Sequence, residues 1–596
     1  MTSGRPVHLM NAVCLTALLW AAVPFDSPVA DAAMRGDTEV VRALLRQGAD
    51  VNAAQGDGMT ALHWAAERGD VELAEVVLYA GANVAAVTRL GDYTPLHLAG
   101  KAGNAPVIVT LMQAGSDANA VTSTGGVTAL HFAAASSSAE AVEVLLDHGA
   151  AVDARETRWG QTPLMFAAAF NRAAAVHVLL QHGADVSLAT KVLDLRAQQE
   201  TDQAAGRRRD QVLEAFGAEH AEDEQTWRPT ASQVQAAVRA AREGQGVLTT
   251  AVDADSVDFE EATPGAMSYV DLVGAEGGLT ALLHAAREGH AEVAMALLDA
   301  GADFDRVSAG DQTSPMLIAM INGRFDLALQ LLERGADPTL ASASGATPLY
   351  AALNTHWAPK ARYPQQQAYQ QQQATYLEVM KVLLDAGADP NARLTKHLWY
   401  MGYTFDLLRV DTKGATPFWR GAYATDVEAM KLLLEYGADP TLATERAPAR
   451  RFGRNRGPPG EDPSGVPPVP IGGPAVYAIH AASGVGYGEG YAANAHRHVP
   501  DGWIPAVRYL IEELDADVNA RDLNGYTPLH HAAARGDNDL IRYLVSKGAD
   551  VTVVSRRGQT TVDMANGPVQ RIQPFPETIA LLESLGAINN HNCVSC

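Results

Sequence analysis

The chain has 596 residues, of which 47 % are hydrophobic, 6 % aromatic and 19 % charged. Its 69 acidic and 45 basic residues give a net charge of −24, which repels phosphate backbones and excludes nucleic acid as a general partner. The hydrophobic content is typical of folded proteins and excludes a mainly disordered chain. No apolar run has the length of a membrane-spanning helix, so we expect no integral membrane span beyond an N-terminal signal or anchor.

Residues 1–26 are expected to form a signal peptide or a short N-terminal anchor. The apolar stretch Ala12–Val23 suits the hydrophobic region of a secretory signal and is too short for a membrane helix. A small-x-small pattern at 30–32 fits a cleavage site, but a cut there would remove part of a helix that begins near Ser27. These features predict an exported protein, periplasmic or bound to the cell envelope. A buried N-terminal helix in a cytoplasmic protein is the alternative.

The body of the chain repeats itself. A Leu-rich stretch followed by Gly-Ala-Asp, with variation in the last letters, recurs with a period of about 33 residues, lengthened in places by insertions. A fixed period of this length predicts a stacked array of small units rather than several separate globules. The glycine of this phrase stands at positions 48, 81, 115, 149, 183, 301, 335, 387, 437, 548 and 586, and Asp515 takes its place once.

Each unit predicts two helices and a turn, as residues 525–558 illustrate. Thr527 can cap the first helix, and Pro528 suits its first position, where no backbone N–H is required. Residues 540–545 carry apolar side chains at helical spacing and predict the second helix. Gly548 is expected to end that helix in a left-handed conformation, after which the chain turns back toward the next unit.

The recurring phrase Thr-Pro-Leu-His makes the chain resemble the ankyrin-repeat family, whose units are helix–turn–helix–hairpin elements of about 33 residues. The resemblance extends over about twelve units and implies an all-α repeat solenoid. It also implies that the histidine of the phrase ties adjacent units together by hydrogen bonds and does not bind metal. The structural motif residues are Thr60, His63, Thr94, Pro95, His97, Thr128, His131, Thr527, Pro528 and His530.

The period divides the chain into two runs of ankyrin-like units. About five units are expected in residues 27–190 and about seven in residues 278–588. The longest insertion, residues 191–277, lies between them and predicts a helical excursion packed on the stack, with helices at 192–216 and 231–244. Shorter insertions are placed near 354–375, 395–413, 445–470 and 484–502, and residues 589–596 form a C-terminal tail.

Two of the shorter insertions carry side chains with an expected role. The insertion at 395–413 is aromatic, and its aromatic residues are either anchors for a partner or residues that pack the loop on its own scaffold. The insertion at 445–470 is rich in Pro, Gly and Arg and predicts a mobile, locally basic linker or arm. The possible partner-binding aromatics are Trp399, Tyr400, Tyr403 and Phe405.

Three histidines and two cysteines remain as candidate ligands for a metal or a haem. His480, His496 and His498 have no compelling ligand spacing and are interpreted as loop histidines. Cys593 and Cys596 have the Cys-x-x-Cys spacing of c-type haem attachment, but the histidine of that motif would have to follow Cys596. No cofactor is therefore expected in the chain as given, and haem c only if the native chain continues. A disulfide or free thiol pair and half of a metal site are the alternatives.

These features together predict a non-enzymatic scaffold. It would bind a protein or peptide partner through the concave face of the stack and the tips of its hairpins. No Gly-x-Ser-x-Gly, phosphate-loop or His-Glu-x-x-His motif points to an enzyme. The alternative is that the array forms the scaffold of an exported c-type haem electron-transfer protein, truncated within its haem motif.

Overall fold

The computed structural model describes residues 27–218, 227–245, 269–358, 366–400, 410–447, 462–487, 497–567 and 573–593. These residues belong to two compact units, an N-terminal unit that ends at Ala151 and a C-terminal unit that begins at Val152. Over the described ranges both units are built from helix pairs, and the single β-sheet has only two short strands. The predicted all-α repeat solenoid is therefore confirmed.

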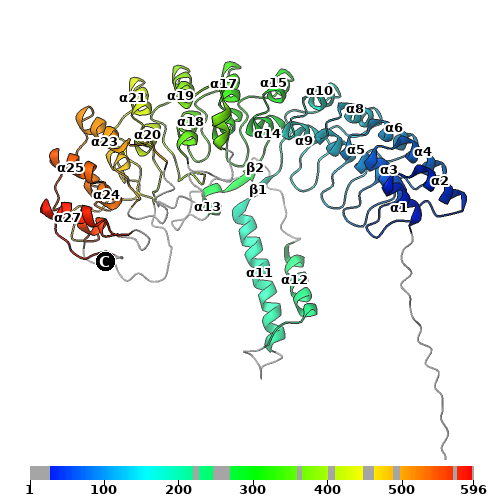
Figure 1. Ribbon diagram of the computed structural model, residues 1–596, viewed down its shortest axis with the longest axis horizontal. Coiled ribbons are helices and arrows are strands. Elements are labelled where there is room, and N and C mark those ends of the chain that lie inside the picture. Colours follow the sequence, from blue (N-terminus) through cyan, green and yellow to red (C-terminus); the bar gives the residue numbers. More distant parts are fainter. Residues whose placement is uncertain are drawn as a thin grey trace, which may run out of the picture. The chain divides into compact units, whose positions relative to one another are not determined.

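Residues 27–151 of the N-terminal unit form four helix pairs (Figure 1). The first helix of each pair packs against the first helix of the next, and the second helices form a parallel layer in the same way. We call these layers inner and outer. The inner helices are α1 (Pro28–Arg35), α3 (Ala61–Arg68), α5 (Pro95–Ala102) and α7 (Ala129–Ala135); the outer ones are α2 (Thr38–Arg46), α4 (Val71–Tyr79), α6 (Ala105–Gln113) and α8 (Ala139–Asp147).

The described part of the C-terminal unit continues the same arrangement with eight further pairs. Its inner helices are α9 (Pro163–Ala169), α14 (Ala281–Glu288), α16 (Pro315–Ile321), α18 (Pro348–Trp357), α20 (Pro417–Tyr423), α22 (Ala478–Ala482), α24 (Pro528–Arg535) and α26 (Thr561–Ala565). Its outer helices are α10 (Ala173–Gln181), α15 (Ala291–Asp299), α17 (Phe325–Glu333), α19 (Tyr376–Asp385), α21 (Val427–Glu435), α23 (Trp503–Glu512), α25 (Asn538–Ser546) and α27 (Pro576–Ser584).

Local sequence explains where these helices begin and end. In α5, the Thr94 hydroxyl accepts the backbone N–H of His97 at 3.4 Å, and Pro95 occupies the first position, which needs no hydrogen-bonded N–H. Outer helix α25 ends before Gly548, whose φ of 92° is readily adopted only by glycine. Asp515 adopts the same left-handed region, with φ 54°, after α23.

Small residues allow the inner helices to approach one another closely. Ala65 and Ala66 of α3 are fully buried beside Leu62. A Cβ atom on Gly100 of α5 would come within 2.6 Å of the carbonyl oxygen of Ala129 in α7, so no larger residue fits there without a shift. The core is thus a continuous layer of Ala and Leu side chains shared between neighbouring pairs.

The longest insertion leaves and re-enters the C-terminal unit through a closed neck. Strand β1 (Val192–Asp194) pairs antiparallel with β2 (Ala275–Gly277), with Val192 opposite Gly277. Next to this pair, the Thr190 backbone N–H donates to the Leu279 carbonyl at 3.0 Å. Beyond the neck, α9 packs directly on α14 and α10 on α15. The stack therefore continues as if the insertion were absent, and the boundary between the compact units lies at 151/152 rather than at the insertion.

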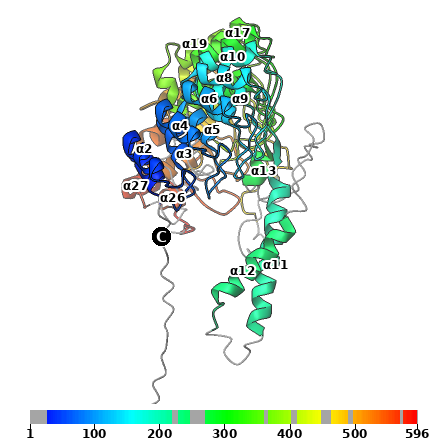
Figure 2. The same ribbon diagram turned by 90° about the vertical axis from the view of Figure 1, so that its right-hand side faces the viewer.

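Helices α11 (Leu195–Ala218) and α12 (Ala231–Gln245) of this insertion pack mainly on each other. Both views show them directed away from the repeat helices of the C-terminal unit (Figures 1 and 2). A short helix, α13 (Tyr269–Val273), leads back to β2, and Arg196 pairs with Asp271 at 2.9 Å. The prediction that the insertion packs on the stack is wrong. Helices α11 and α12 form an arm that is joined to the repeats through the short β1–β2 neck. The arm has few apolar side chains that could pack on the repeats.

The other insertions are tied down at their described ends. Gln366–Gln371 forms a 3₁₀-helix, η2, between α18 and α19. Glu445 pairs with Pro474 across a second neck, and residues 462–470 are held on the hairpins of later repeats, so the prediction of a free arm is wrong for these residues. Among the described helices, none has the length and apolarity needed to cross a membrane.

Candidate interaction surface

The Thr–His pair at the start of an inner helix links one repeat to the next. In α3, Nδ1 of His63 accepts the backbone N–H of Thr60 at 3.2 Å and lies 2.8 Å from its hydroxyl. Nε2 lies 2.9 Å from the carbonyl oxygen of Tyr93 in the following hairpin. Because Nδ1 accepts a hydrogen bond, Nε2 must carry the proton and donate to that carbonyl. The neutral ring is thus clamped between two repeats.

In the other motif histidines, Nδ1 likewise contacts the threonine at the start of the helix. His97 has Nδ1 3.0 Å from the Thr94 nitrogen and Nε2 3.0 Å from the Ala120 carbonyl oxygen. Burial lowers the pKa of His63 and His97, and it lowers that of His530 to about 3, so these rings stay neutral. Equivalent Thr–His contacts join Thr128 to His131 and Thr527 to His530, and Pro528 occupies the first position of α24 as Pro95 does in α5.

All the described inner helices of the C-terminal unit except α24 depart from the Thr–His motif, and two of them still carry a histidine at its place or directly after it. In α22, Tyr477 replaces the threonine, yet His480 still lies 2.9 Å from the Ala520 carbonyl oxygen through Nε2. Sequence reasoning interpreted His480 as a loop histidine, although the Ala-Ala pair that follows it matches the motif. In α14, Leu283 takes the histidine place and His284 follows it. Neither ring nitrogen of this buried His284 has a hydrogen-bond partner among the described residues.

The residue that follows the motif histidine, which we call the face position, is apolar and half-buried in the N-terminal unit. It is Trp64 in α3, Leu98 in α5 and Phe132 in α7. The Tyr93 ring of the intervening hairpin lies 5.8 Å from the Phe132 ring. Trp64 donates through Nε1 to the Gln55 side chain at 2.8 Å, which fixes the indole. Three adjacent inner helices thus present a row of apolar side chains.

The hairpins of the N-terminal unit add exposed apolar residues. Leu90 is 84 % exposed and Val121 is 57 % exposed. Neighbouring hairpins are joined through their backbones, since Arg89 donates to the Asp57 carbonyl at 2.8 Å. We define the N-terminal inner surface by the face residues and these hairpin residues: Trp64, Leu90, Tyr93, Leu98, Val121 and Phe132.

Face positions in the later repeats of the C-terminal unit, from α18 onward, are buried instead. Arg420 of α20 is 2 % exposed, and its Nε donates to the Asn354 side chain at 2.9 Å. The guanidinium also lies 5.8 Å from the ring of Tyr423. The residues at this position in the remaining later repeats are Ala351, Ala481, His531 and Met564, all of them buried.

The described beginning of the aromatic insertion at 395–413 packs on its own scaffold. Tyr400 is 7 % exposed, and burial raises the pKa of its hydroxyl above the usual value. Thr395 donates to the carbonyl oxygens of Ser344 through its backbone and Ala343 through its hydroxyl, both at 2.9 Å. Tyr400 is therefore unavailable as a partner anchor. Trp399, whose ring lies 5.4 Å from that of Tyr400, is half-buried, and Tyr403 and Phe405 lie outside the described residues.

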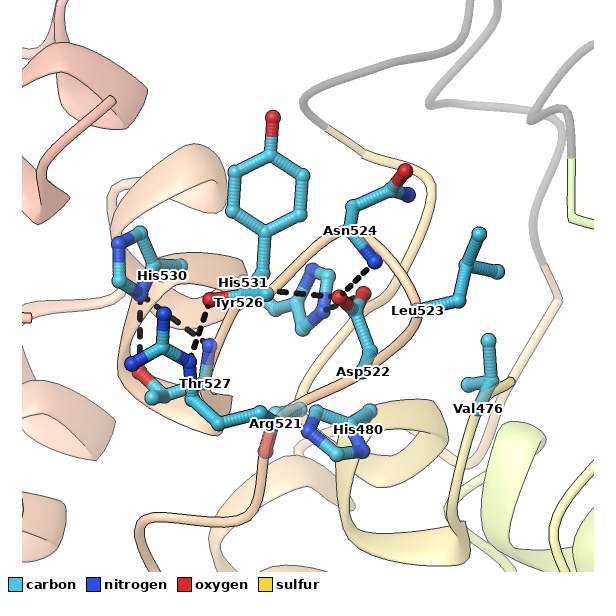
Figure 3. Close-up of polar contacts among 12 residues, drawn as sticks. Val476, His480, Arg521, Asp522, Leu523, Asn524, Tyr526, Thr527, His530 and His531 are labelled. Atoms are coloured by element: carbon cyan, nitrogen blue, oxygen red, sulfur yellow. Dashed lines mark hydrogen bonds and ion pairs between the residues drawn. The ribbon is translucent and has the colours of Figure 1, made fainter. Parts of the chain in front are cut away.

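A buried polar cluster distinguishes the repeat of α24 (Figure 3). Nε2 of His531, at the face position, lies 3.3 Å from Oδ2 of Asp522, and both side chains are at most 2 % exposed. The His480 ring lies 5.8 Å from His531, edge to face. Asp522 also accepts the backbone N–H groups of Asn524 and Tyr526 at 2.8 and 2.9 Å. Burial alone would raise the pKa of Asp522, but His531 and these amides lower it overall.

The remaining candidate ligands are dispersed. His498 bonds to the carbonyl of Val499 at 2.8 Å, and His496 lies outside the described residues. Within the described residues, no group of three His, Cys, Asp or Glu side chains is placed to hold a metal ion. Cys593 is disulfide-bonded, and Cys596 lies outside the described residues.

Comparison with known proteins identifies these repeats. The family model "Ankyrin repeats (3 copies)" matches residues 12–88, 29–122, 96–190 and 263–342, and "Ankyrin repeats (many copies)" matches residues 510–565. Together the matches cover more than half of the chain, which therefore belongs to the ankyrin-repeat family. The predicted family is confirmed.

Relatives among known proteins share short stretches of this array. The chain is 34 % identical over 85 residues to ankyrin repeat and SAM domain-containing protein 6 of Rattus norvegicus, covering 14 % of this chain and 9 % of that protein. It is 44 % identical over 52 residues to human ankyrin repeat domain-containing protein 49, covering 9 % and 22 %. It is 38 % identical over 72 residues to mouse protein phosphatase 1 regulatory subunit 27, covering 12 % and 46 %. The chain thus spans less than half of each relative.

Proposed function

We propose that this chain is a non-enzymatic scaffold that binds a protein or peptide partner through the N-terminal inner surface. The observation that carries the proposal is the row formed by Trp64, Leu98 and Phe132, which are apolar and half-buried in three consecutive inner helices. In the later repeats the equivalent positions are buried and give a partner little to contact. Half-exposed aromatic residues in rigid positions are favoured as interface anchors, because little side-chain entropy is lost on binding.

A comparison of two aromatic variants tests this proposal. The purified chain is immobilised as wild type, as Trp64→Ala/Phe132→Ala, and as Tyr79→Ala, and each form is incubated with an extract of the native cell. Tyr79 is the matched control because it is an aromatic residue of outer helix α4 and is 96 % exposed. We expect a partner retained by wild type and by Tyr79→Ala to be lost from the double variant. Identical retained proteins on all three forms would contradict the proposal.

Export of the chain stays a prediction, for which the structure restricts the site of cleavage. Helix α1 spans Pro28–Arg35, and Val29, Ala30 and Ala32 are fully buried. Cleavage after Ala32 would remove five of the eight residues of this helix, so a signal peptidase would have to cut before Ser27. N-terminal sequencing of the chain purified from the periplasm of an expressing cell would locate the cut. A mature protein that begins at Ala33 would contradict the proposal.

Haem c attachment likewise stays a prediction, conditional on a native chain that continues with a histidine after Cys596. The tail before it is fixed on the last repeat, since Asn592 donates its backbone N–H to Asp563 at 3.2 Å. The disulfide at Cys593 would have to be reduced before a thioether formed. Mass spectrometry of the extended chain, expressed with haem-attachment machinery, would show the added haem, and Cys593→Ser/Cys596→Ser would remove it.

A further inference from the structure

The Pro-rich segment 466–470 has a backbone that its own sequence restricts. It reads Val-Pro-Pro-Val-Pro, and the pyrrolidine ring of each proline (Pro467, Pro468 and Pro470) locks φ in the narrow range of an extended left-handed helix. The residues that precede these prolines are pushed out of the α-helical region toward extended conformations. Together these restraints favour polyproline II, which has three residues per turn and no internal backbone hydrogen bonds.

The burial of the segment follows the same period of three. Val466 and Val469 are half-buried, whereas Pro467 and Pro470 are exposed on a second edge. Pro468 and Ile471 are exposed on the third, with Ile471 at 62 %. In a polyproline II helix over 466–471, this burial would put one edge against the protein and two edges toward solvent.

Two arginines hold the segment in place through its carbonyl oxygens. Arg556 donates to the carbonyl oxygens of Val466 at 2.8 Å and Pro467 at 2.6 Å, and it pairs with Asp462 at 2.6 Å. Arg446 donates its guanidinium to the carbonyl of Val469 and its backbone N–H to the carbonyl of Gly473 at 2.8 Å. We call residues 462–473 the proline strap.

The ion pair between Asp462 and Arg556 at the start of the proline strap stays charged. The hydroxyl and amide of Ser464, together with Arg556, lower the pKa of Asp462 to about 2, so its carboxylate remains ionised beside the guanidinium. The Arg556 side chain is only 17 % exposed and also donates to the Leu523 carbonyl at 2.9 Å. The proline strap is therefore fastened to a rigid hairpin of the repeat array.

We propose that the proline strap is itself a recognition site, bound by a partner domain whose surface carries an aromatic-lined groove for polyproline II. Pro467 and Pro470 have the P-x-x-P spacing that places both on one edge, and such domains recognise that edge. A segment whose prolines restrict its backbone and which the protein already holds in place loses little conformational entropy on binding. In this interaction the chain presents a ligand, which makes the site independent of the N-terminal inner surface.

Binding to proline-recognition domains tests the proposal. Purified SH3, WW and EVH1 domains are titrated with the full chain, and the tryptophan fluorescence of each domain reports occupation of its aromatic groove. We expect at least one domain to bind the wild type, and Pro467→Ala/Pro470→Ala to weaken that binding at least tenfold. Pro463→Ala changes an exposed proline outside the 467–470 pair and should alter the affinity less than twofold. Trp64→Ala should leave it unchanged.

A separate measurement gives the contribution that Arg556, which holds the start of the proline strap, makes to binding. A synthetic peptide of residues 462–473 must be ordered by the domain, so we expect it to bind several-fold more weakly than the full chain. Arg556→Ala in the full chain should weaken binding to a similar extent. Thermal unfolding of every variant is recorded so that a loss of fold is recognised. If no domain binds the folded wild type, or if the double proline variant binds equally well, the proposal is wrong.

Discussion

Single residues decide whether a repeat shows an apolar face or a buried polar one. The face position holds Trp64, Leu98 or Phe132 in the N-terminal unit, whereas three described repeats of the C-terminal unit have a buried polar residue there, namely His284, Arg420 and His531. A buried polar side chain is tolerated where it has a hydrogen-bonding or charged partner, as His531 has in Asp522. Where no partner meets it, the cost of removing it from water remains.

His284 is the clearest case of that cost. It is fully enclosed, burial lowers its pKa to about 3, and its ring nitrogens have no partner among the described residues. We predict that His284→Leu, which places at this position the side chain found in α5, raises the unfolding free energy by about 1–3 kcal/mol. Urea unfolding of both proteins at pH 7 checks this. A destabilised variant would show that the imidazole has a partner.

The contribution of a single Thr–His contact to the unfolding free energy should be measurable. We predict that Thr94→Val, which removes the hydroxyl beside His97 and keeps the side-chain volume, lowers the unfolding free energy by about 1 kcal/mol, as expected for a capping residue. Thermal unfolding measures the change. Thr110→Val serves as a control, because Thr110 lies on outer helix α6 and bonds only within its own helix. An equal loss in both variants would argue against a special role for the clamp.

Buried histidines also make stability depend on pH. Burial lowers the pKa of His480 to about 4 and that of His530 to about 3. The unfolded chain binds protons on these residues near pH 6.5, whereas the folded chain does not, so stability falls as pH decreases from about 6.5 toward 4. We predict a slope of up to about 1.4 kcal/mol per pH unit for each such ring. Urea midpoints at pH 7, 6, 5 and 4 measure it, and a midpoint that stays constant contradicts the prediction.

At the scale of elements, sequence periodicity predicted the helix pairs because each pair is encoded locally. A capping threonine, a first-turn proline and a closing glycine act within one unit, as around α24 and α25. The paths of the insertions were less predictable, because contacts between distant residues set them. Arg556, 94 residues from Asp462, holds the proline strap, and neither residue signals this contact in its own surroundings.

The arm formed by α11 and α12 should be removable. Replacing Val192–Gly277 by Asn-Gly joins Lys191 to Gly278 through a two-residue hairpin turn of the preferred type. Packing of α9 on α14 does not involve the arm, so we predict a change in unfolding free energy of less than about 1 kcal/mol. Leu283→Ala, a fully buried truncation in α14, should by contrast cost about 2–5 kcal/mol. A larger loss from the deletion would mean that the arm supports the stack.

At the scale of the whole molecule, each repeat of a stacked array is stabilised only by its own contacts and by its interfaces with the neighbouring repeats. Within each unit, the inner helices of the described repeats pack on the inner helices before and after them, as α24 packs on α22 and α26. In the described part of each unit, the core accordingly runs from one repeat to the next. The two compact units, which meet at 151/152, are expected to unfold with some independence.

This independence gives the last prediction. Leu529 of α24 is fully buried, so Leu529→Ala should remove about 2–5 kcal/mol from its repeat. Hydrogen exchange measured by mass spectrometry should then rise in α22–α27, because those helices share interfaces with α24 or with its neighbours. Exchange in α1–α8 of the N-terminal unit should stay within error of the wild type. An increase spread evenly over both units would mean that the chain unfolds as one cooperative body, and nearest-neighbour stacking would then not describe its energetics.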